Sequence, residues 1–382
     1  MFLPKKHSDS GSTIFSEMTI LAQKQEAVNL SQGFPDYEID NRLKKLLCEG
    51  TEKNFNQYAP MPGNPLLIEN LIEFNKQRTI PISITKENIT ISPGATYGIY
   101  TALASIISFG DEVIVLEPNY DSYVPAIEMN GGKSVFVSLN DDFKVDFEAL
   151  KQAIAEKSKA IIINSPHNPS GKIWKKEDWE KLSNIIEDTE IIIISDEVYD
   201  ILTYDDREFY SAFHHPKLRE RCFSIFSFGK MFHITGWKVG YILASPELSE
   251  AYRRVHQYLA FSVNAPAQYA LAKYLEVFDR NVNIKLMQEK RDFFLNEFQN
   301  LPFTLNEKAE AGYFQILNFK NISDLSDKDF AVWLTEKAKV ATIPVSAFYH
   351  DQKSTGNVRF CFAKKEETIL KAIQNLKEHL NY

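Results

Sequence analysis

The sequence has only three cysteines, Cys48, Cys222 and Cys361, and they lie far apart along the chain. Such scattered thiols form neither a disulfide framework nor a pair of metal ligands, which is typical of proteins from a reducing compartment. No apolar run approaches the roughly 18 residues that span a bilayer. The N-terminal MFLPKKHSDSGS also lacks an apolar signal core after its charges. We therefore expect a cytoplasmic protein with no metal site.

The chain also lacks an excess of positive charge. It has 43 Lys and Arg against 51 Asp and Glu, a net charge of −8. This balance argues against nucleic acid or an anionic membrane as the main partner. No G-x-G-x-x-G follows a predicted strand, which disfavours a nucleotide-dependent oxidoreductase. The 382 residues are 44% hydrophobic, enough for one large domain and a smaller one.

Short apolar strands alternate with helices through the middle of the chain, which predicts a parallel-rich sheet covered on both faces. The predicted strands are 87–92, 111–117, 133–139, 159–164, 190–195, 222–228 and 239–245, and the predicted helices are 96–108, 146–157 and 175–188. From Pro246 to about Leu295 the pattern predicts one long helix. Mixed helices and short strands after it predict a smaller α+β domain.

Polar residues follow several of these strands, at the edge of an α/β sheet where ligands bind. Gly94-Ala95-Thr96 opens a helix, which predicts either an anion site or a plain helix cap. Asn168, held between two prolines, either donates its amide to a ligand or serves the Asn-Pro turn.

Charged groups complete this edge. Asp196 follows four isoleucines and needs a partner if it is buried; a protonated ring nitrogen would be one, and a helix-cap role is the alternative. Lys230 can form a Schiff base with a carbonyl cofactor, and Lys238 can hold the anion of that cofactor, although most lysines are surface charges. Arg359, in an apolar strand, suits a carboxylate ligand or an internal salt bridge.

The ordered motifs resemble those of the fold-type-I, class I aminotransferases that depend on pyridoxal phosphate. They are SQGFPDY, NQYAPMPGNPLL, SPGAT, EPNYDSY, NSPHNPSGK, SDEVY, SFGKxxxxTGWKVGY and RFCFAK, from about residue 13 onward. SQGFPD, NQYAPM, VHQYLAFSVNAPAQ, IPVSAF and a lysine at 238 are most similar to the methionine and kynurenine aminotransferase (glutamine transaminase K) branch.

The resemblance implies an α/β fold, with a mostly parallel seven-stranded sheet between helices and a smaller α+β domain. It also implies an N-terminal segment (1–45) that packs with the small domain, a large cofactor-binding domain (46–285) and a small C-terminal domain (286–382). The soft boundary near residue 285 falls within the predicted long helix.

The resemblance also implies a role for each matching residue. Lys230 would hold pyridoxal 5′-phosphate as an aldimine and then carry the proton between the substrate Cα and the cofactor. Asp196 would pair with the ring nitrogen. The other cofactor contacts would be Asn168 and Tyr199 at the phenolic oxygen, Tyr120 on the ring face, and Gly94, Ala95, Thr96, Ser227, Lys238 and the neighbouring subunit's Tyr58 at the phosphate. Arg359, assisted by Asn168 and the Gly33 backbone, would bind the substrate carboxylate.

The implied enzyme is a homodimer with shared active sites. Phe15, Phe34, Tyr58 and the partner's Phe261 would surround the substrate side chain, and no second arginine suggests itself for a dicarboxylate. Such a pocket favours methionine, phenylalanine, tyrosine or kynurenine. The expected reaction is ping-pong transamination to a 2-oxo acid.

Two alternatives are a C–S β-lyase, which would use the same cofactor residues, and a non-catalytic binding protein. The intact Lys230, Asp196 and Arg359 disfavour the binding protein. One departure from the family is Met231, where a small hydroxyl residue is common.

Overall fold

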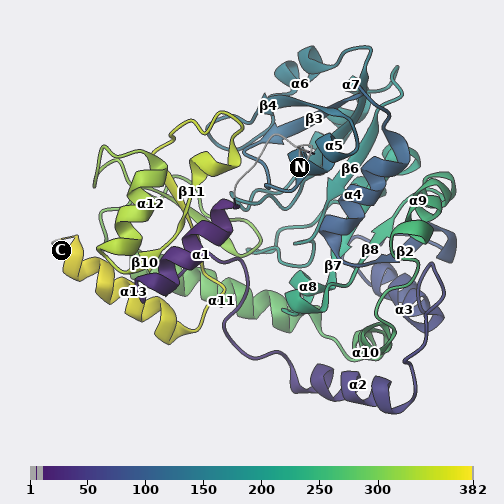
Figure 1. Ribbon diagram of the computed structural model, residues 1–382, viewed down its shortest axis with the longest axis horizontal. Coiled ribbons are helices and arrows are strands. Elements are labelled where there is room, and N and C mark those ends of the chain that lie inside the picture. The colour runs from purple at the N-terminus through teal and green to yellow at the C-terminus, as the bar shows by residue number, and fades with distance from the viewer. Residues whose placement is uncertain (1–5, 7–11, 381–382) are drawn as a thin grey trace, which may run out of the picture.

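The computed structural model describes residues 12–380 together with Lys6, and a seven-stranded sheet dominates it (Figure 1). The strand order is β2–β8–β7–β6–β5–β3–β4. The strands are β2 (Ile89–Ser92), β3 (Glu112–Glu117), β4 (Lys133–Ser138), β5 (Ser158–Asn164), β6 (Ile192–Asp196), β7 (Cys222–Ser227) and β8 (Gly240–Leu243). β8 runs antiparallel to both of its neighbours, β2 and β7, and every other pair in this sheet is parallel. The predicted mostly parallel sheet and all seven strands are confirmed.

Helices cover both faces of this sheet. On one face lie α4 (Ala95–Ile106), α5 (Tyr123–Met129) and α9 (Pro246–Leu259), which share a buried cluster with Val113 and Val115 of β3. Ile114, which lies between these two valines, points to the other face and packs in the core there with α3 (Pro65–Lys76), α7 (Lys176–Ile185) and α10 (Ala265–Leu275). Because side chains alternate along a strand, a run of apolar residues is buried on both sides. Beyond these layers, α6 (Phe147–Ala153) packs beside α7, and α2 (Asn41–Glu52) packs on α10.

A second, antiparallel sheet has the order β11–β12–β9. Its strands are β9 (Phe314–Asn318), β11 (Ile343–Pro344) and β12 (Asn357–Cys361), and the helices of this part are α11 (Arg280–Phe298), α12 (Asp327–Glu336) and α13 (Glu366–His379). The N-terminal α1 (Ile14–Lys24) packs on α12, and β1 (Val28–Asn29) pairs in parallel with β10 (Val340–Ala341). Figure 1 accordingly shows α1 beside the C-terminal elements, to the left of the large sheet.

The prediction of one helix from Pro246 to about Leu295 is wrong. The segment forms three helices, α9, α10 and α11, separated near 260–264 and 276–279. Phe261 adopts a left-handed φ of 62°, and the Asn264 side chain caps α10 by accepting from Ala267 N. Asp279 caps α11 by accepting from Asn281 N. Hydrophobic periodicity continues through both breaks, but these caps start new helices. The helices α1, α2, α3 and α5 were not predicted.

In the stretch that the structure describes, no helix combines the length and the apolar character required to cross a bilayer. Cys48 is exposed and Cys222 and Cys361 are buried, and all three are free thiols. The prediction about a missing signal core falls on residues 1–12, most of which lie outside the described residues.

A buried ion pair joins the segment after β6 to the chain just beyond α3. Arg78 Nη2 lies 2.5 Å from Asp200 Oδ2, and their side chains are only 6% and 0% exposed. Arg78 also donates to Asn75 Oδ1 and to the Tyr241 hydroxyl of β8. Burial raises the pKa of Asp200, although Arg78 opposes that rise. The pair therefore fixes the chain a few residues beyond Asp196.

Replacing Arg78 by leucine should destabilise the protein by about 3–5 kcal/mol, because the Asp200 carboxylate would remain buried without its cation. Urea denaturation at neutral pH measures the loss. The matched control is Arg254→Leu, since the Arg254–Glu250 pair is 75% and 67% exposed. That control should cost about 0.5 kcal/mol or less. Equal losses in the two variants would contradict the role assigned to the buried pair.

Candidate functional site

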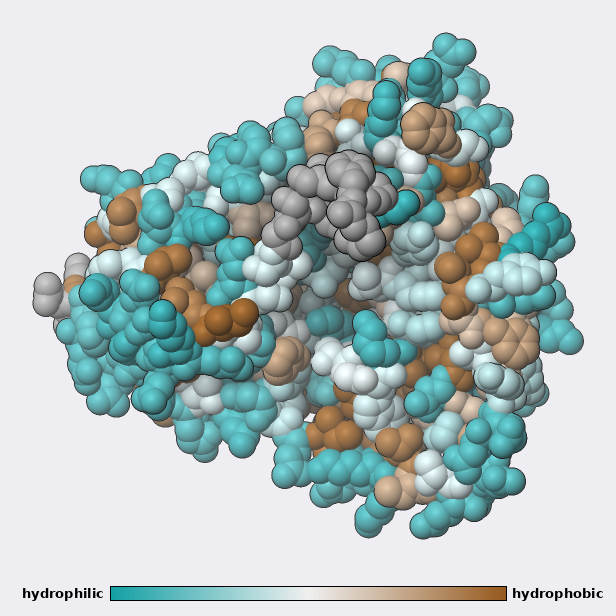
Figure 2. All heavy atoms as spheres, in the orientation of Figure 1, coloured by the Kyte–Doolittle hydropathy of each residue, from teal (hydrophilic) through white to brown (hydrophobic). Residues whose placement is uncertain are grey.

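A cavity of about 1370 Å³ lies between the carboxyl ends of the large-sheet strands and the part that contains α1 and β12. Figure 2 shows the same face of the molecule hollowed between these two parts, with hydrophilic and hydrophobic residues mixed on the surface around the hollow. The cavity brings together most of the predicted site residues: Phe15, Gly33, Phe34, Gly94, Ala95, Thr96, Tyr120, Asn168, Asp196, Tyr199, Ser227, Lys230, Lys238 and Arg359.

Two predicted residues do not line this cavity. Tyr58 is 83% exposed and Phe261 is 42% exposed. Their rings contact each other edge to face, with centroids 5.6 Å apart. The structure therefore places them together on the surface of the subunit, away from the other site residues.

Asp196 ends β6 and is buried at the floor of the cavity. Its Oδ2 accepts a 2.6 Å hydrogen bond from the Tyr123 hydroxyl, and its Oδ1 accepts a 3.3 Å bond from Val198 N. Burial raises the pKa of Asp196 to about 6, against the effect of these donors and of Lys230. A buried carboxylate without a full counter-charge favours a cationic N–H partner in the cavity.

Lys230 lies in the short helix α8 (Phe228–Met231), directly after β7. Its Nζ donates to the Gly33 carbonyl oxygen at 2.9 Å and lies 5.6 Å from the ring centroids of Tyr199 and Tyr313. Burial lowers the pKa of Lys230 to about 8; the charges of Arg359 and Lys238 act in the same direction, while Asp196 opposes it. Much of this amine is therefore neutral, and hence nucleophilic, in mildly alkaline solution.

The first turn of α4 forms an anion cradle. Its N-cap is Gly94, with a φ of 85°, and no side chain in the described part of the chain caps this end. A Cβ added at Gly94 would lie 3.5 Å from Lys238 Nζ, so the lysine ammonium stands beside the helix terminus. Free backbone N–H groups, the helix dipole and this cation together suit a phosphate. Gly94 occupies the N-cap position without a side-chain cap, so the first N–H groups of α4 are open to an anion.

Arg359 of β12 faces the cavity from the opposite side. It is 1% exposed and donates to Asn168 Oδ1 at 2.7 Å and to the Ser31 carbonyl oxygen at 2.9 Å. Its Nε has no partner among the described residues, and its guanidinium lies over the Phe314 ring at 3.8 Å. Burial lowers the pKa of Arg359 to about 10. Both hydrogen bonds go to neutral acceptors and no carboxylate of the described residues forms an ion pair with Arg359, so its charge is available for a carboxylate ligand.

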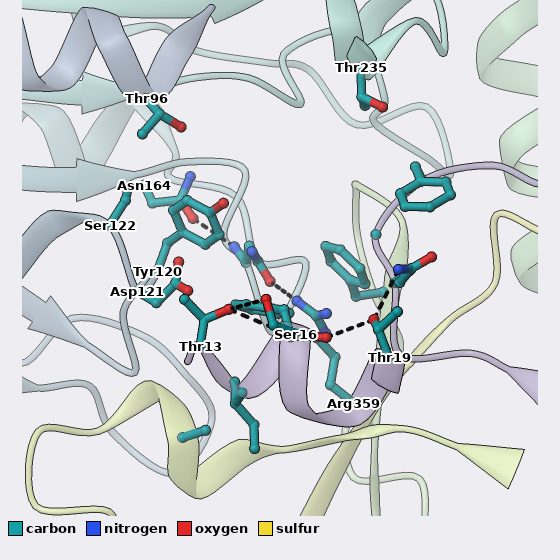
Figure 3. Close-up of a pocket in the computed structure, with 18 of the residues that line it drawn as sticks. Thr13, Ser16, Thr19, Thr96, Tyr120, Asp121, Ser122, Asn164, Thr235 and Arg359 are labelled. Atoms are coloured by element: carbon teal, nitrogen blue, oxygen red, sulfur yellow. Dashed lines mark hydrogen bonds between the residues drawn. The ribbon is translucent and has the colours of Figure 1, made fainter. Parts of the chain in front are cut away.

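Figure 3 shows the two ends of the cavity. Arg359 lies beside Ser16 and Thr19 of α1, whereas Thr96 and Thr235 lie at the far side. Tyr120 packs between these ends, with its ring centroid 6.1 Å from that of Phe15. Asn168 is positioned by Asn164, whose Oδ1 accepts from Asn168 N at 2.7 Å. Asn168 Oδ1 is occupied by Arg359, which leaves the Asn168 amide N–H groups as donors.

Sequence reasoning missed several residues that shape this site. Tyr123 holds Asp196, Asn164 holds Asn168, and Phe314 underlies Arg359. Tyr123 and Asn164 belong to two of the family motifs, EPNYDSY and NSPHNPSGK, and this membership is the sequence signal that could have identified them. Phe314 belongs to none of the motifs, and its position beside Arg359 results from the antiparallel pairing of β9 with β12.

Comparisons with known proteins agree on one family. A family model described as "Aminotransferase class I and II" matches residues 25–376. The chain is 39% identical over 371 residues to an Escherichia coli methionine aminotransferase, covering 96% of each chain. It is 34% identical to a Dictyostelium discoideum kynurenine–oxoglutarate transaminase, covering 98% of this chain and 96% of the relative.

Solved structures agree with the sequence relatives. An E. coli structure described as having a methionine aminotransferase function superposes with a TM-score of 0.95 at 38% identity, covering 99% and 100% of the two chains. A Mycobacterium tuberculosis N-succinyldiaminopimelate aminotransferase superposes with a TM-score of 0.92 at 31% identity, covering 96% and 97%.

The lowered pKa of Lys230 predicts unusual reactivity toward a small aldehyde. Because burial disfavours the ammonium form, reductive methylation of Lys230 in the ligand-free protein should be half-maximal near pH 8. Ordinary lysines should follow the free-amine pKa of roughly 10.4. Peptide mass spectrometry across a pH series measures both, with exposed lysines of the same digest as the internal control. A Lys230 profile that coincides with theirs would contradict this account of the buried amine.

Proposed function

Because this chain belongs to the class I and II aminotransferases, we propose that it transfers the amino group of methionine, or of another large uncharged amino acid, to a 2-oxo acid by a ping-pong mechanism. The family implies pyridoxal 5′-phosphate as the cofactor. When bound, this group supplies an aldehyde that bonds to amines and a ring that delocalises negative charge.

The residues at the cavity floor fit this cofactor. The uncapped N-terminus of α4, Lys238 and Ser227 would bind the phosphate. Asp196, oriented by the Tyr123 hydroxyl, would pair with a protonated ring nitrogen, which would offset the cost of burying the carboxylate.

The other cofactor contacts come from three side chains at the sheet edge. Asn168 retains free amide N–H groups for the phenolic oxygen, because its own oxygen is occupied by Arg359. Tyr199 lies on the same side of the cavity, and its phenol stays protonated because burial raises its pKa well above the ordinary value. Tyr120 packs against the ring face.

Lys230 would hold the cofactor covalently. Once a substrate amine displaced it, Nζ would accept the proton that leaves the substrate α carbon and would donate that proton to the cofactor. A pKa of about 8 suits a group that must first accept and then donate a proton, because a group whose pKa is near the working pH does both readily.

The observation that carries the proposal is the buried guanidinium of Arg359 in the same cavity as Lys230. Its Nε lacks a partner among the described residues, and both of its hydrogen bonds go to neutral groups. A substrate α-carboxylate would supply the missing negative charge through a two-point contact. Holding the carboxylate there places the α carbon of an amino acid between Arg359 and Lys230.

The residues around the substrate side chain support an uncharged donor. Phe15 and Phe34 line the cavity, and Arg359 is the only arginine among its described lining residues. Lys328, at the rim, lies 3.5 Å from Glu17 and is thereby partly neutralised. A side-chain carboxylate therefore has no arginine of its own. Apolar pockets separate similar side chains by only about 1–3 kcal/mol, so several large donors should react.

Tyr58 and Phe261 support a homodimer in this proposal. The pair lies on the surface with Tyr258 and Leu259, which are 86% and 50% exposed. Such exposed apolar side chains favour burial against a second copy. In such a dimer, Tyr58 would bind the phosphate of the neighbouring site and Phe261 would line its substrate pocket.

Replacing Lys230 by alanine tests the catalytic assignment. Turnover of methionine with a 2-oxo acid should fall by at least about 10³-fold, because the proton carrier is lost. The matched control is Lys290→Ala, which removes a half-buried lysine that donates to the Lys364 carbonyl oxygen. Circular dichroism and gel filtration should be unchanged in both variants. If Lys230→Ala retained the parent rate, or if Lys290→Ala lost as much, the assignment would be wrong.

A further inference from the structure

The short helix that carries Lys230 cannot satisfy its own main chain. α8 has only four residues, and the last carbonyl groups of any helix lack partners within it. Two of its carbonyl oxygens are paired locally: Phe228 O accepts from Phe232 N at 2.9 Å, and Gly229 O accepts from Ile234 N at 3.0 Å. The carbonyl groups of Lys230 and Met231 remain.

Two side chains from distant parts of the chain complete this set. The Tyr313 hydroxyl donates to Lys230 O at 2.6 Å, and Asn283 Nδ2 donates to Met231 O at 2.8 Å. Tyr313 immediately precedes β9 of the small sheet, and Asn283 lies in the first turn of α11. All four carbonyl groups of α8 are thus paired, although the sequence separations are 83 and 52 residues.

His233 joins the two side chains. Its Nδ1 lies 2.8 Å from the Tyr313 hydroxyl oxygen, and its Nε2 lies 2.8 Å from Asn283 Oδ1. Since Lys230 O can only accept, the single phenol proton goes to it, and Nδ1–H must donate to the phenol oxygen. The ring thereby orients the Tyr313 hydroxyl. A neutral ring has a single N–H, so it donates either to the Tyr313 oxygen or to Asn283 Oδ1, and only the doubly protonated ring donates to both.

The surroundings of the His233 ring favour its neutral form. Burial lowers the pKa of His233 to about 4, and the positive charges of Lys230 and Lys290 act in the same direction. The aromatic rings of Tyr37 and Tyr313 pack on its other sides. Within the described residues no carboxylate contacts His233, and the hydrogen bond to Asn283 is the one interaction that favours a second proton.

None of Tyr313, Asn283 and His233 lines the cavity. We propose that these three are positioning residues for Lys230. They hold the main chain of α8 from outside the cavity, while the Lys230 amine faces the cavity. This inference rests on the proposed function for the role of Lys230. The proposed role explains how a four-residue helix keeps the Lys230 amine in one orientation. Tyr313, beside the small sheet, and Asn283 of α11 supply the hydrogen bonds that the carbonyl groups of α8 need.

The test is Tyr313→Phe in the holoenzyme, with Tyr204→Phe as the matched control. Tyr204 is also a buried tyrosine whose hydroxyl donates to a main-chain carbonyl, that of Gly312, but it does not contact α8. The main measurement is the pH midpoint of the visible absorbance change of the loaded cofactor. Thermal stability, and kcat and KM for the amino donor, are measured alongside.

Tyr313→Phe should raise the absorbance midpoint by about 0.5 pH unit or more, because a loosened Lys230 is better hydrated and its charged form is favoured. kcat should fall by about tenfold with KM changed by less than about twofold. Asp196, Arg359 and Lys238, the charged groups that face Lys230, are left intact. Tyr204→Phe should lose similar thermal stability but keep the midpoint and kcat of the parent.

A second variant keeps the test valid if Tyr313→Phe does not fold. His233→Asn retains a residue that tolerates the left-handed φ of 60° at this position. It should shift the absorbance midpoint in the same direction as Tyr313→Phe. Unchanged midpoints in both variants, or equal shifts in Tyr204→Phe, would overturn the positioning role. Absence of any cofactor band in the parent would instead contradict the proposed function.

Discussion

The site depends on one constraint, the burial of ionisable groups at the carboxyl edge of a sheet that is covered on both faces. Burial raises the pKa of Asp196 to about 6 and lowers that of Lys230 to about 8, so desolvation moves an acid and a base toward neutrality from opposite directions. Neither group is paired with the other by a hydrogen bond. Asp196 is held by Tyr123, and Lys230 donates to Gly33 O. Asp196 can therefore pair with a cationic group of a ligand, and the Lys230 amine can bond to a carbonyl carbon of a ligand.

The second sheet makes this edge into a complete site. β12 brings Arg359 across the cavity, where it touches Asn168 from the large sheet and Ser31 from the N-terminal loop. Tyr313, next to β9, reaches the main chain of Lys230 on the far side. The C-terminal part therefore supplies both the Arg359 guanidinium in the cavity and the Tyr313 hydroxyl that pairs with the main chain of Lys230. We propose that the boundary between the two parts falls within α11, which runs from Arg280 to Phe298 and contributes Asn283.

The sequence predicts those features whose cause is local. Isoleucine-rich strands, the glycine that opens α4 and the charged residues after each strand are all visible as short patterns, and the structure places them at one edge. The helix breaks near Phe261 and Asp279 were not predicted, because one left-handed residue and one side-chain cap outweigh a continuing apolar period. The support from Tyr123, Tyr313 and Asn283 was also missed, since hydrogen bonds across 73, 83 and 52 residues leave no local pattern. The roles of Tyr58 and Phe261 stay predictions, because they concern a second subunit.

The central claim is that Lys230 and Arg359 act together on an α-amino acid through a bound pyridoxal phosphate. Its most direct test adds methionine alone, with no 2-oxo acid, to the cofactor-loaded protein and follows the visible absorbance together with the products. The account predicts loss of the absorbance band, one 2-oxo acid formed per site, and an amino group retained on the protein-bound cofactor. An unchanged band, or free ammonia released in place of the retained amino group, would contradict it.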